Sequence, residues 1–306
     1  MTRLDVVLVR THPELSRRKA RDVVEKGQVS VDGVTVTEPG RMLQADAAIA
    51  WNPNRKALPR ARLSLPILYS DPTLVIVDKP AGLLSVPSGP GAATEDTALL
   101  RVQEYASHLP GRRSGFVGVV HRLDRGTSGA LAFALDPPTR QSLRALFRQH
   151  RIDRRYAALV EGAPEGDSGE IALPIRDAYV GGKRGIALPG EPSRPALTRW
   201  KVIERFRGAA LLDVELGTGR QHQIRIHLAH AGHPVIGDET YRTVGAATPI
   251  AARRPLLHSR LLGFLHPQTG RSVRAESPLP DDFRRALATL RTAPRRPRSR
   301  GRRGGR

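Results

Sequence analysis

The residues best suited to chemistry lie in one polar turn between two apolar runs, in the segment GVVHRLDRGTSGALAFAL at 118–135. The apolar runs have the character of strands, and a rigid sheet can present reactive groups on such a connecting loop. A carboxylate held between two arginines should stay ionised at neutral pH, as a nucleophile must. We therefore take Asp124 as the candidate nucleophile. The polar residues of the turn are His121, Arg122, Asp124, Arg125, Thr127 and Ser128.

A purely structural role for Asp124 is the alternative. An aspartate in a loop often forms an Asx-turn, with Thr127, Ser128 and Gly129 completing the connection. The residues of the turn do not by themselves separate this role from catalysis.

The chain carries a large excess of positive charge. Lys and Arg total 50 against 29 Asp and Glu, which gives a formal charge of +21 over 306 residues. Eight arginines and no acidic residue lie within 291–306, so +13 remains on the rest of the chain. A basic body of this kind predicts a polyanionic partner such as RNA. Surplus charge that is merely solvated is the alternative.

Four histidines lie close together in sequence, and histidines three or four residues apart on a helix can share a metal ion. Gly232 should end that helix before the last of them, and the chain has no cysteine to complete a site. We therefore expect hydrogen-bonding and RNA-facing roles instead of a metal site. The glycines near the polar turn match neither a phosphate-binding loop nor a dinucleotide fingerprint, so no cofactor is expected. The histidines are His222, His227, His230 and His233.

No apolar run approaches the roughly 18 residues that a membrane helix requires. The first residues, MTRLDVVLVRTHPELS, lack the apolar core and cleavage site of a signal peptide. The expectation is a cytoplasmic protein that makes no membrane contact.

Residues 1–51 predict a small α+β domain. Ser16 is placed to cap a helix over RRKARDVVEK, Gly27 to end it, and Asp32-Gly33 to turn a hairpin within QVSVDGVTV. This order of elements resembles the alpha-L RNA-binding module named after ribosomal protein S4. The resemblance implies that the basic helix contacts RNA, although a solvated helix face would look similar. The RNA-binding candidates are Arg17, Arg18, Lys19 and Arg21.

The rest of the chain predicts a linker, a larger domain and a tail. Residues 52–66 are rich in Pro and Arg and lack apolar periodicity. Residues 67–290 mix short strand-like runs with fewer helical patterns, which predicts an α+β domain with a mixed, mostly antiparallel sheet. Residues 291–306 have too few apolar side chains for a core and should be disordered.

Three motifs resemble those of the RluA-type family of RNA pseudouridine synthases. The segment from His121 to Gly129 resembles the family signature HRLDxxTSG. The segment RRYAALVEG at 154–162 resembles the second motif, a basic residue and Tyr before an apolar strand and Gly. The segment GRQHQIRIHLAHAGHPVIGD at 219–238 resembles the third. The motifs follow the family's order, and the resemblance extends over nearly the whole chain.

The resemblance implies a fold of the pseudouridine synthase type and a role for each matching residue. Asp124 would be the nucleophile and Arg225 its ionic partner. Tyr156 would pack on the target base and is a candidate for removing its carbon-bound proton. Arg122 would fill the gap left in the RNA when the target nucleotide is extruded. The reaction would need neither a cofactor nor a metal.

The resemblance also implies a substrate, which is structured RNA. Large-subunit ribosomal RNA is expected, with transfer RNA as the alternative, and a monomer is the simplest assembly. A noncatalytic RNA-binding or ribosome-assembly protein would share the basic body, but it would not need Asp124, Tyr156 and Arg225 together. A nucleic-acid glycosidase could also place a carboxylate beside an extruded base. Only isomerisation would leave the mass of the RNA unchanged.

Overall fold

The computed structural model describes residues 2–32, 34–36, 39–44, 47–55, 65–89, 95–109, 116–242 and 248–292. The chain forms two units: Met1–Ser64 with Arg101–Phe116, and Leu65–Leu100 with Val117–Arg306. Most of the expected linker at 52–66 and of the expected tail at 291–306 lies outside the described residues. Within the described residues, no helix has the length and apolar character needed to cross a membrane.

The smaller unit contains the helix and hairpin predicted from the sequence. The side chain of Ser16 accepts a hydrogen bond from the Lys19 amide at 3.2 Å, which confirms the N-cap. Gly27 follows the helix with φ of 65°, the left-handed conformation that commonly ends a helix. Asp32 also has a positive φ, 51°, as the predicted hairpin turn requires. Gly33 lies outside the described residues. The elements are β1 (Thr2–Arg3), α1 (Leu4–Thr11), α2 (Arg17–Glu25), β2 (Val29–Val31), β3 (Val34–Val36), β4 (Met42–Leu43) and β5 (Ile49–Trp51).

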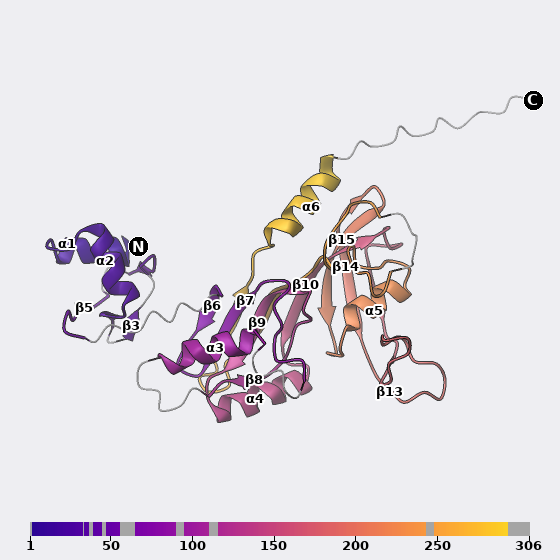
Figure 1. Cartoon of the computed structure of the whole chain (residues 1–306), viewed down its shortest axis with the longest axis horizontal. Coiled ribbons are helices and arrows are strands. Elements are labelled where there is room, and N and C mark those ends of the chain that lie inside the picture. The colour runs from indigo at the N-terminus through magenta and orange to yellow at the C-terminus, as the bar shows by residue number, and fades with distance from the viewer. Residues whose placement is uncertain are drawn as a thin grey trace, which may run out of the picture. The chain divides into compact units, whose positions relative to one another are not determined.

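The larger unit is built on one long sheet (Figure 1). Its strands are β6 (Ile67–Ser70), β7 (Leu74–Lys79), β8 (Gly118–Val119), β9 (Ser128–Ala134), β10 (Asp153–Glu161), β11 (Ser168–Ile171), β14 (Thr198–Phe206), β15 (Ala209–Leu216), β16 (Leu257–Leu265) and β17 (Ser272–Glu276). A short pair, β12 (Ile175–Arg176) and β13 (Ser193–Arg194), lies outside the sheet. The helices are α4 (Pro137–Arg148), α5 (Gln223–His230) and α6 (Asp281–Thr292). Helix α3 (Ala98–Ser107) starts in this unit and continues into the smaller one.

The strand order β11-β14-β15-β10-β16-β9-β7-β6 confirms the predicted mixed, mostly antiparallel sheet. Strand β17 pairs with β16, and β8 pairs with β9. Among the described strands, only β16 and β9 run parallel. The segment between them in sequence, 135–256, carries β10, β14, β15 and α5. The parallel pairing therefore brings the polar turn before β9 close to elements that follow it much later in the chain.

Two apolar cores hold helices against the sheet. Leu143 of α4 packs with residues of β7, β9, β16 and β17. Phe283 and Leu287 of α6 pack with residues of β10 and β15. Each such fully buried side chain contributes about 1.5–3 kcal/mol to the free energy of folding. Helix α4 is capped at its start, where the carboxylate of Asp136 accepts a hydrogen bond from the Thr139 amide at 2.7 Å.

Two residues that were expected to belong to the disordered tail, Arg291 and Thr292, are helical. Arg291 and Thr292 form the last residues of α6. Nη2 of Arg291 lies 2.6 Å from Oε2 of Glu204 in β14, so this arginine has an ionic partner that its sequence context did not indicate.

Gly129 permits the close approach of β9 and β16. Its φ is 112°, and a Cβ atom at this position would lie 2.2 Å from the carbonyl oxygen of Ser259, its partner in β16. No side chain fits there, so the glycine that follows Thr127-Ser128 is required by packing.

We predict that Gly129→Ala lowers the free energy of unfolding by at least about 3 kcal/mol, since it adds a backbone clash to the cost of a positive φ. Gly270→Ala is the matched control, because Gly270 has φ of 68° and no atom within 4 Å of an added Cβ. That variant should lose only about 1 kcal/mol. Urea unfolding measures both values, and equal losses would contradict the packing role.

Candidate active site

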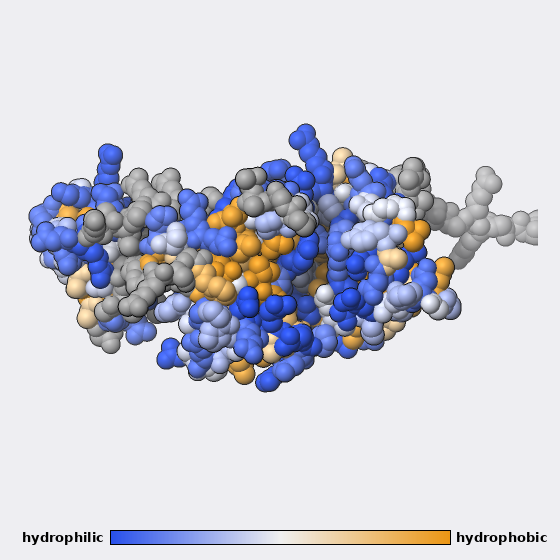
Figure 2. Space-filling model, turned by 60° about the horizontal axis from the view of Figure 1, so that its bottom comes forward, coloured by the Kyte–Doolittle hydropathy of each residue, from blue (hydrophilic) through white to orange (hydrophobic). Residues whose placement is uncertain are grey.

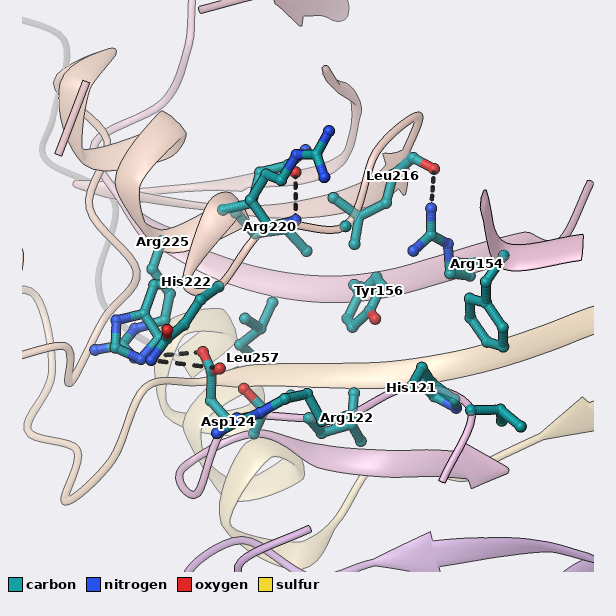
Figure 3. A pocket seen from close by; sticks show the side chains of 18 of the residues that line it. His121, Arg122, Asp124, Arg154, Tyr156, Leu216, Arg220, His222, Arg225 and Leu257 are labelled. Carbon is teal, nitrogen blue, oxygen red and sulfur yellow. Dashed lines mark hydrogen bonds and ion pairs between the residues drawn. The ribbon is translucent and has the colours of Figure 1, made fainter. Parts of the chain in front are cut away.

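One cleft in the larger unit gathers the candidate catalytic residues (Figure 3). It has a volume of about 620 Å³, with walls from the loop between β8 and β9, from β10 and α4, and from the turn before α5. Figure 2 shows strongly hydrophilic residues bordering a hollow in this unit. Among the described residues that line the cleft, Asp124 is the only carboxylate, so the walls attract anions. The lining arginines are Arg122, Arg144, Arg148, Arg154, Arg220 and Arg225.

Asp124 lies on the loop between β8 and β9, with its side chain 20% exposed. Its Oδ2 lies 3.4 Å from Nη1 of Arg225, which is 101 positions later in the chain. Its Oδ1 lies 3.9 Å from Nε2 of His222 (Figure 3). The fold thus brings the carboxylate to two cationic or hydrogen-bonding groups from the third motif.

The expectation that Arg122 and Arg125 hold Asp124 between them is wrong. Within the described chain, neither arginine forms an ion pair with this carboxylate. Nε of Arg125 instead donates to the Gly82 carbonyl oxygen at 3.0 Å. Arg122 is exposed and lines the cleft. Sequence neighbours in a loop point in different directions, so the positive charge comes from Arg225.

Arg225 is held in place by Asp238, a residue for which the motifs predicted no role. Nε and Nη2 of Arg225 donate to Oδ2 and Oδ1 of Asp238 at 2.6 and 2.8 Å, and both side chains are buried. Burial acts against the charge, but the hydrogen bonds to Asp238 raise the pKa of Arg225 above its usual range. With two nitrogens bound to Asp238, Nη1 is the one directed at Asp124. The sequence feature that could have pointed to Asp238 was its place as the acidic residue that ends the third motif.

Tyr156 lies on β10 and is 6% exposed. Figure 3 shows its ring in the cleft between Asp124 and Arg154. Burial raises the pKa of Tyr156, so the hydroxyl keeps its proton at neutral pH. The ring therefore offers a neutral surface for a planar ligand. Arg154, the basic residue of the second motif, is also buried, and its Nη2 donates to the Leu216 carbonyl oxygen at 3.1 Å.

Two side chains fix the start of the loop that carries Asp124. Oγ of Ser85 accepts from the Leu123 amide at 3.0 Å and donates to the Leu123 carbonyl oxygen at 2.7 Å. Nε2 of His121 accepts from the Ala132 amide at 3.0 Å, and its ring stacks on Phe147 with centroids 4.6 Å apart. Desolvation lowers the pKa of His121 to about 3, so the ring is neutral and can accept this hydrogen bond.

Two cationic side chains bind carbonyl groups later in the same loop. Nζ of Lys79, at the end of β7, donates to the carbonyl oxygens of Leu83 at 2.8 Å and Arg125 at 3.4 Å. Burial lowers the pKa of Lys79 to about 7, yet an amine can donate in either protonation state. Nη1 of Arg254 donates to the Gly126 carbonyl oxygen at 3.1 Å. Lys79 ends an apolar run and Arg254 follows Arg253 in a connection, so neither has a periodic signal and the sequence did not predict their roles.

The histidines of the third motif separate to different partners. Nδ1 of His222 lies 2.8 Å from the Tyr241 hydroxyl. Nε2 of His227 lies 3.0 Å from the Leu173 carbonyl oxygen, and His230 is exposed. Within the described part of the chain, no three His, Asp or Glu side chains come together as a metal site requires.

The four basic residues expected to bind RNA lie along an open groove at the start of α2. Two of them face the fully buried carboxylate of Asp5, with Nε–oxygen distances of 4.0 Å for Arg17 and 3.6 Å for Arg21. Arg18 and Lys19 are exposed. The positive charges of Arg17 and Arg21 are therefore partly balanced by Asp5.

We predict that Ser85→Ala loosens the loop around Asp124. The variant leaves the buried amide and carbonyl of Leu123 without their partner, which should cost about 1–3 kcal/mol of unfolding free energy. Hydrogen exchange at the Leu123 amide should accelerate, since local opening becomes easier. Ser107→Ala, in the exposed last turn of α3, is the control and should change neither measurement. Unaltered exchange at Leu123 in the first variant would mean that the loop does not depend on Ser85.

Comparison with known proteins matches both units to families. Residues 73–230 match the model of the RNA pseudouridylate synthase family, and residues 2–49 match the S4 domain. An RNA pseudouridine synthase of Mycobacterium bovis is 37% identical over 285 residues, 90% of this chain and 91% of that protein. The ribosomal large subunit pseudouridine synthase D of Pseudomonas aeruginosa is 32% identical over 303 residues, 94% of this chain and 92% of that protein.

The fold has relatives among solved structures. Human RNA pseudouridylate synthase domain containing 4 superposes with a TM-score of 0.62 over 74% of this chain and 92% of its own, at 23% identity. The mixed sheet with its cleft is therefore the fold of these enzymes. Together with the matched families and full-length relatives, it identifies the chain as a member of the RluA-type RNA pseudouridine synthases, isomerases that act on RNA, with an S4 domain at its N-terminus.

Proposed function

We propose that this enzyme converts specific uridines of large-subunit ribosomal RNA to pseudouridine and that Asp124 is its nucleophile. Several full-length relatives carry the name ribosomal large subunit pseudouridine synthase D, which supports the choice of RNA. The S4 domain supports a structured substrate, because its basic groove suits a folded RNA backbone.

The contact between Asp124 and Arg225 carries the proposal for the nucleophile. The carboxylate is the only one that lines the cleft among the described residues, arginines are its charged neighbours there, and its oxygen is 3.4 Å from a guanidinium that Asp238 fixes. A charged partner of this kind keeps a carboxylate ionised and orients it toward a ligand. A residue that only formed a turn would not need such a partner.

The geometry suits isomerisation of an extruded uridine. The arginine-lined walls would hold the RNA backbone and offset the few kcal/mol that extrusion costs. The Tyr156 ring would stack on the base beside Asp124. The carboxylate would then attack the nucleotide, at the ribose or at the base, and the bond from nitrogen to ribose would break. The base would turn and rejoin the ribose through carbon 5, and the bond to Asp124 would break. Carbon 5 would finally lose its proton, and the freed ring nitrogen would gain one, so that the product is an isomer of uridine.

Asp124→Asn tests the nucleophile, because the amide keeps the size and hydrogen bonding of the side chain but not its charge. We predict that tritium release from carbon 5 of uridine in RNA falls by more than about 10⁴-fold. RNA binding and thermal stability should stay close to wild type. Release at the wild-type rate would remove Asp124 from the mechanism, and a product RNA of lower mass would indicate a glycosidase.

The rate of the Arg225→Lys variant should lie between that of wild type and that of Asp124→Asn. Lysine keeps a positive charge but cannot bind Asp238 and Asp124 at once through a planar fork. We predict a rate lower by about 10²-fold, in the range expected when one positioned donor is lost. The same tritium assay measures it, and a rate equal to that of wild type would show that charge alone suffices.

The smaller unit should bind RNA chiefly through its exposed cations. We predict that Arg18→Ala with Lys19→Ala weakens RNA binding and lowers the slope of log K against log salt by nearly one unit for each lost phosphate contact. The double variant Arg10→Ala with Arg41→Ala removes the same charge from exposed positions of this unit outside the groove. Equal effects of the two pairs would indicate unspecific attraction in place of a binding groove.

A further inference from the structure

The second oxygen of the Asp124 carboxylate faces a histidine that has no part in the proposed reaction steps. Nη1 of Arg225 approaches Oδ2, while Nε2 of His222 lies 3.9 Å from Oδ1 (Figure 3). A carboxylate held at one oxygen can still rotate about its side-chain bonds. A donor at each oxygen would fix its plane, which matters for a nucleophile that must meet a substrate atom in one direction.

The backbone at His222 is strained in a way that brings its side chain into the cleft. His222 has φ of 57°, the left-handed conformation that is unfavourable for residues with a side chain. The turn around it is fixed by Gln223, whose Oε1 accepts from the Thr218 hydroxyl at 2.7 Å and the Arg220 amide at 2.9 Å. The ring therefore enters the cleft from a rigid turn.

The two ring nitrogens of His222 face different groups, Tyr241 at Nδ1 and Asp124 at Nε2, and these groups bear on which nitrogen carries the proton. The Tyr241 hydroxyl lies 2.8 Å from Nδ1 of His222. Burial raises the pKa of Tyr241 to about 12, so the hydroxyl is protonated at neutral pH and can donate to Nδ1 when that nitrogen is unprotonated. The imidazole then carries its own proton on Nε2, the atom that faces Asp124. The opposite tautomer would direct a lone pair at a carboxylate oxygen, which is electrostatically unfavourable.

We propose that Tyr241 and His222 form a hydrogen-bonded pair that positions the nucleophile, with His222 donating from Nε2 to Oδ1 of Asp124 when the substrate is bound. The inference rests on the proposed role of Asp124. A shift of about 1 Å converts the present separation into a hydrogen bond, and such contacts often shorten in the substrate complex. His222 and Tyr241 would thus be positioning residues.

The surrounding charges are consistent with a neutral imidazole. Burial lowers the pKa of His222, and Arg225 and Arg122 act in the same direction. Asp124 and Asp238 act in the opposite direction, and the net shift is downward. The Tyr241 ring also lies against the Arg225 guanidinium, 5.0 Å from ring centre to carbon. One aromatic residue therefore contacts both side chains that approach the carboxylate.

The tautomer can be measured on the free protein. Long-range proton–nitrogen NMR spectra of protein labelled with ¹⁵N-histidine distinguish protonated from unprotonated ring nitrogens, and the His222 signals are those missing from His222→Gln. We expect the Nε2-protonated form in wild type and a mixture of tautomers in Tyr241→Phe, which keeps the ring against Arg225. A wild-type spectrum dominated by the Nδ1-protonated form would overturn the proposal.

The catalytic effect is measured as single-turnover pseudouridine formation in an in vitro transcript of large-subunit ribosomal RNA with tritium at carbon 5 of uridine. We expect His222→Phe to be slower by about 10²-fold, with Kd for the transcript within about threefold of wild type. His222→Gln retains a donor and should recover part of the rate. His230→Phe, on the exposed end of α5, is the control and should match wild type.

A double-mutant comparison tests whether Tyr241 acts through His222. Tyr241→Phe should be slower by about tenfold on its own but should add nothing to His222→Phe, because the two residues act as one unit. If the double variant were slower than His222→Phe by the full factor that Tyr241→Phe shows alone, the two residues would act separately. That result, or a wild-type rate for His222→Phe, would overturn the proposed pair. A wild-type protein that forms no pseudouridine, or an active Asp124→Asn variant, would instead reject the proposed function, while the NMR result would still report on the pair.

Discussion

The site depends on the buried ion pair between Arg225 and Asp238. A guanidinium in this interior position would cost several kcal/mol without a carboxylate, and Asp238 supplies one at two nitrogens. The pair fixes α5 against the segment that follows it and leaves one nitrogen directed at Asp124. Because Asp238 holds Nε and Nη2 in fixed positions, Nη1 has a defined direction, which mobile water molecules at the other two nitrogens would not give it.

Asp124, the other partner in the contact with Arg225, is held rigidly for a different reason. The loop that carries Asp124 is held by hydrogen bonds to its backbone, from Ser85, Lys79 and Arg254, and by the stacked ring of His121. These partners come from the end of β7, the connection after it, the residues after β8 and the connection before β16, and Gly129 lets β9 and β16 approach closely. The carboxylate of Asp124 and the guanidinium of Arg225 are therefore fixed independently, and the fold determines the distance between them.

The sequence predicted much of the fold because its signals are local. The Ser16 cap, the glycine after α2 and the apolar runs that became β9 and β10 each depend on neighbours within a few positions. The residues of the loop alone mispredicted the ion pairing of Asp124 for the same reason, whereas the resemblance of the third motif implied Arg225, whose Nη1 lies 3.4 Å from Oδ2. Proximity in sequence suggested Arg122 and Arg125, whereas the partner lies 101 positions away.

The sequence by itself determined the family, the class of reaction and the candidates Asp124, Tyr156 and Arg225, because the three motifs keep residue types and spacing that chemistry constrains. Only the tertiary structure decided which groups surround them. Ser85, Lys79 and Tyr241 are polar residues of types that are common in turns and at strand ends, so they carry no periodic signal, and Asp238 ends the third motif without a predicted role. Their roles arise from contacts across the sheet between segments far apart in sequence, and a contact of that kind exists only once the chain has folded.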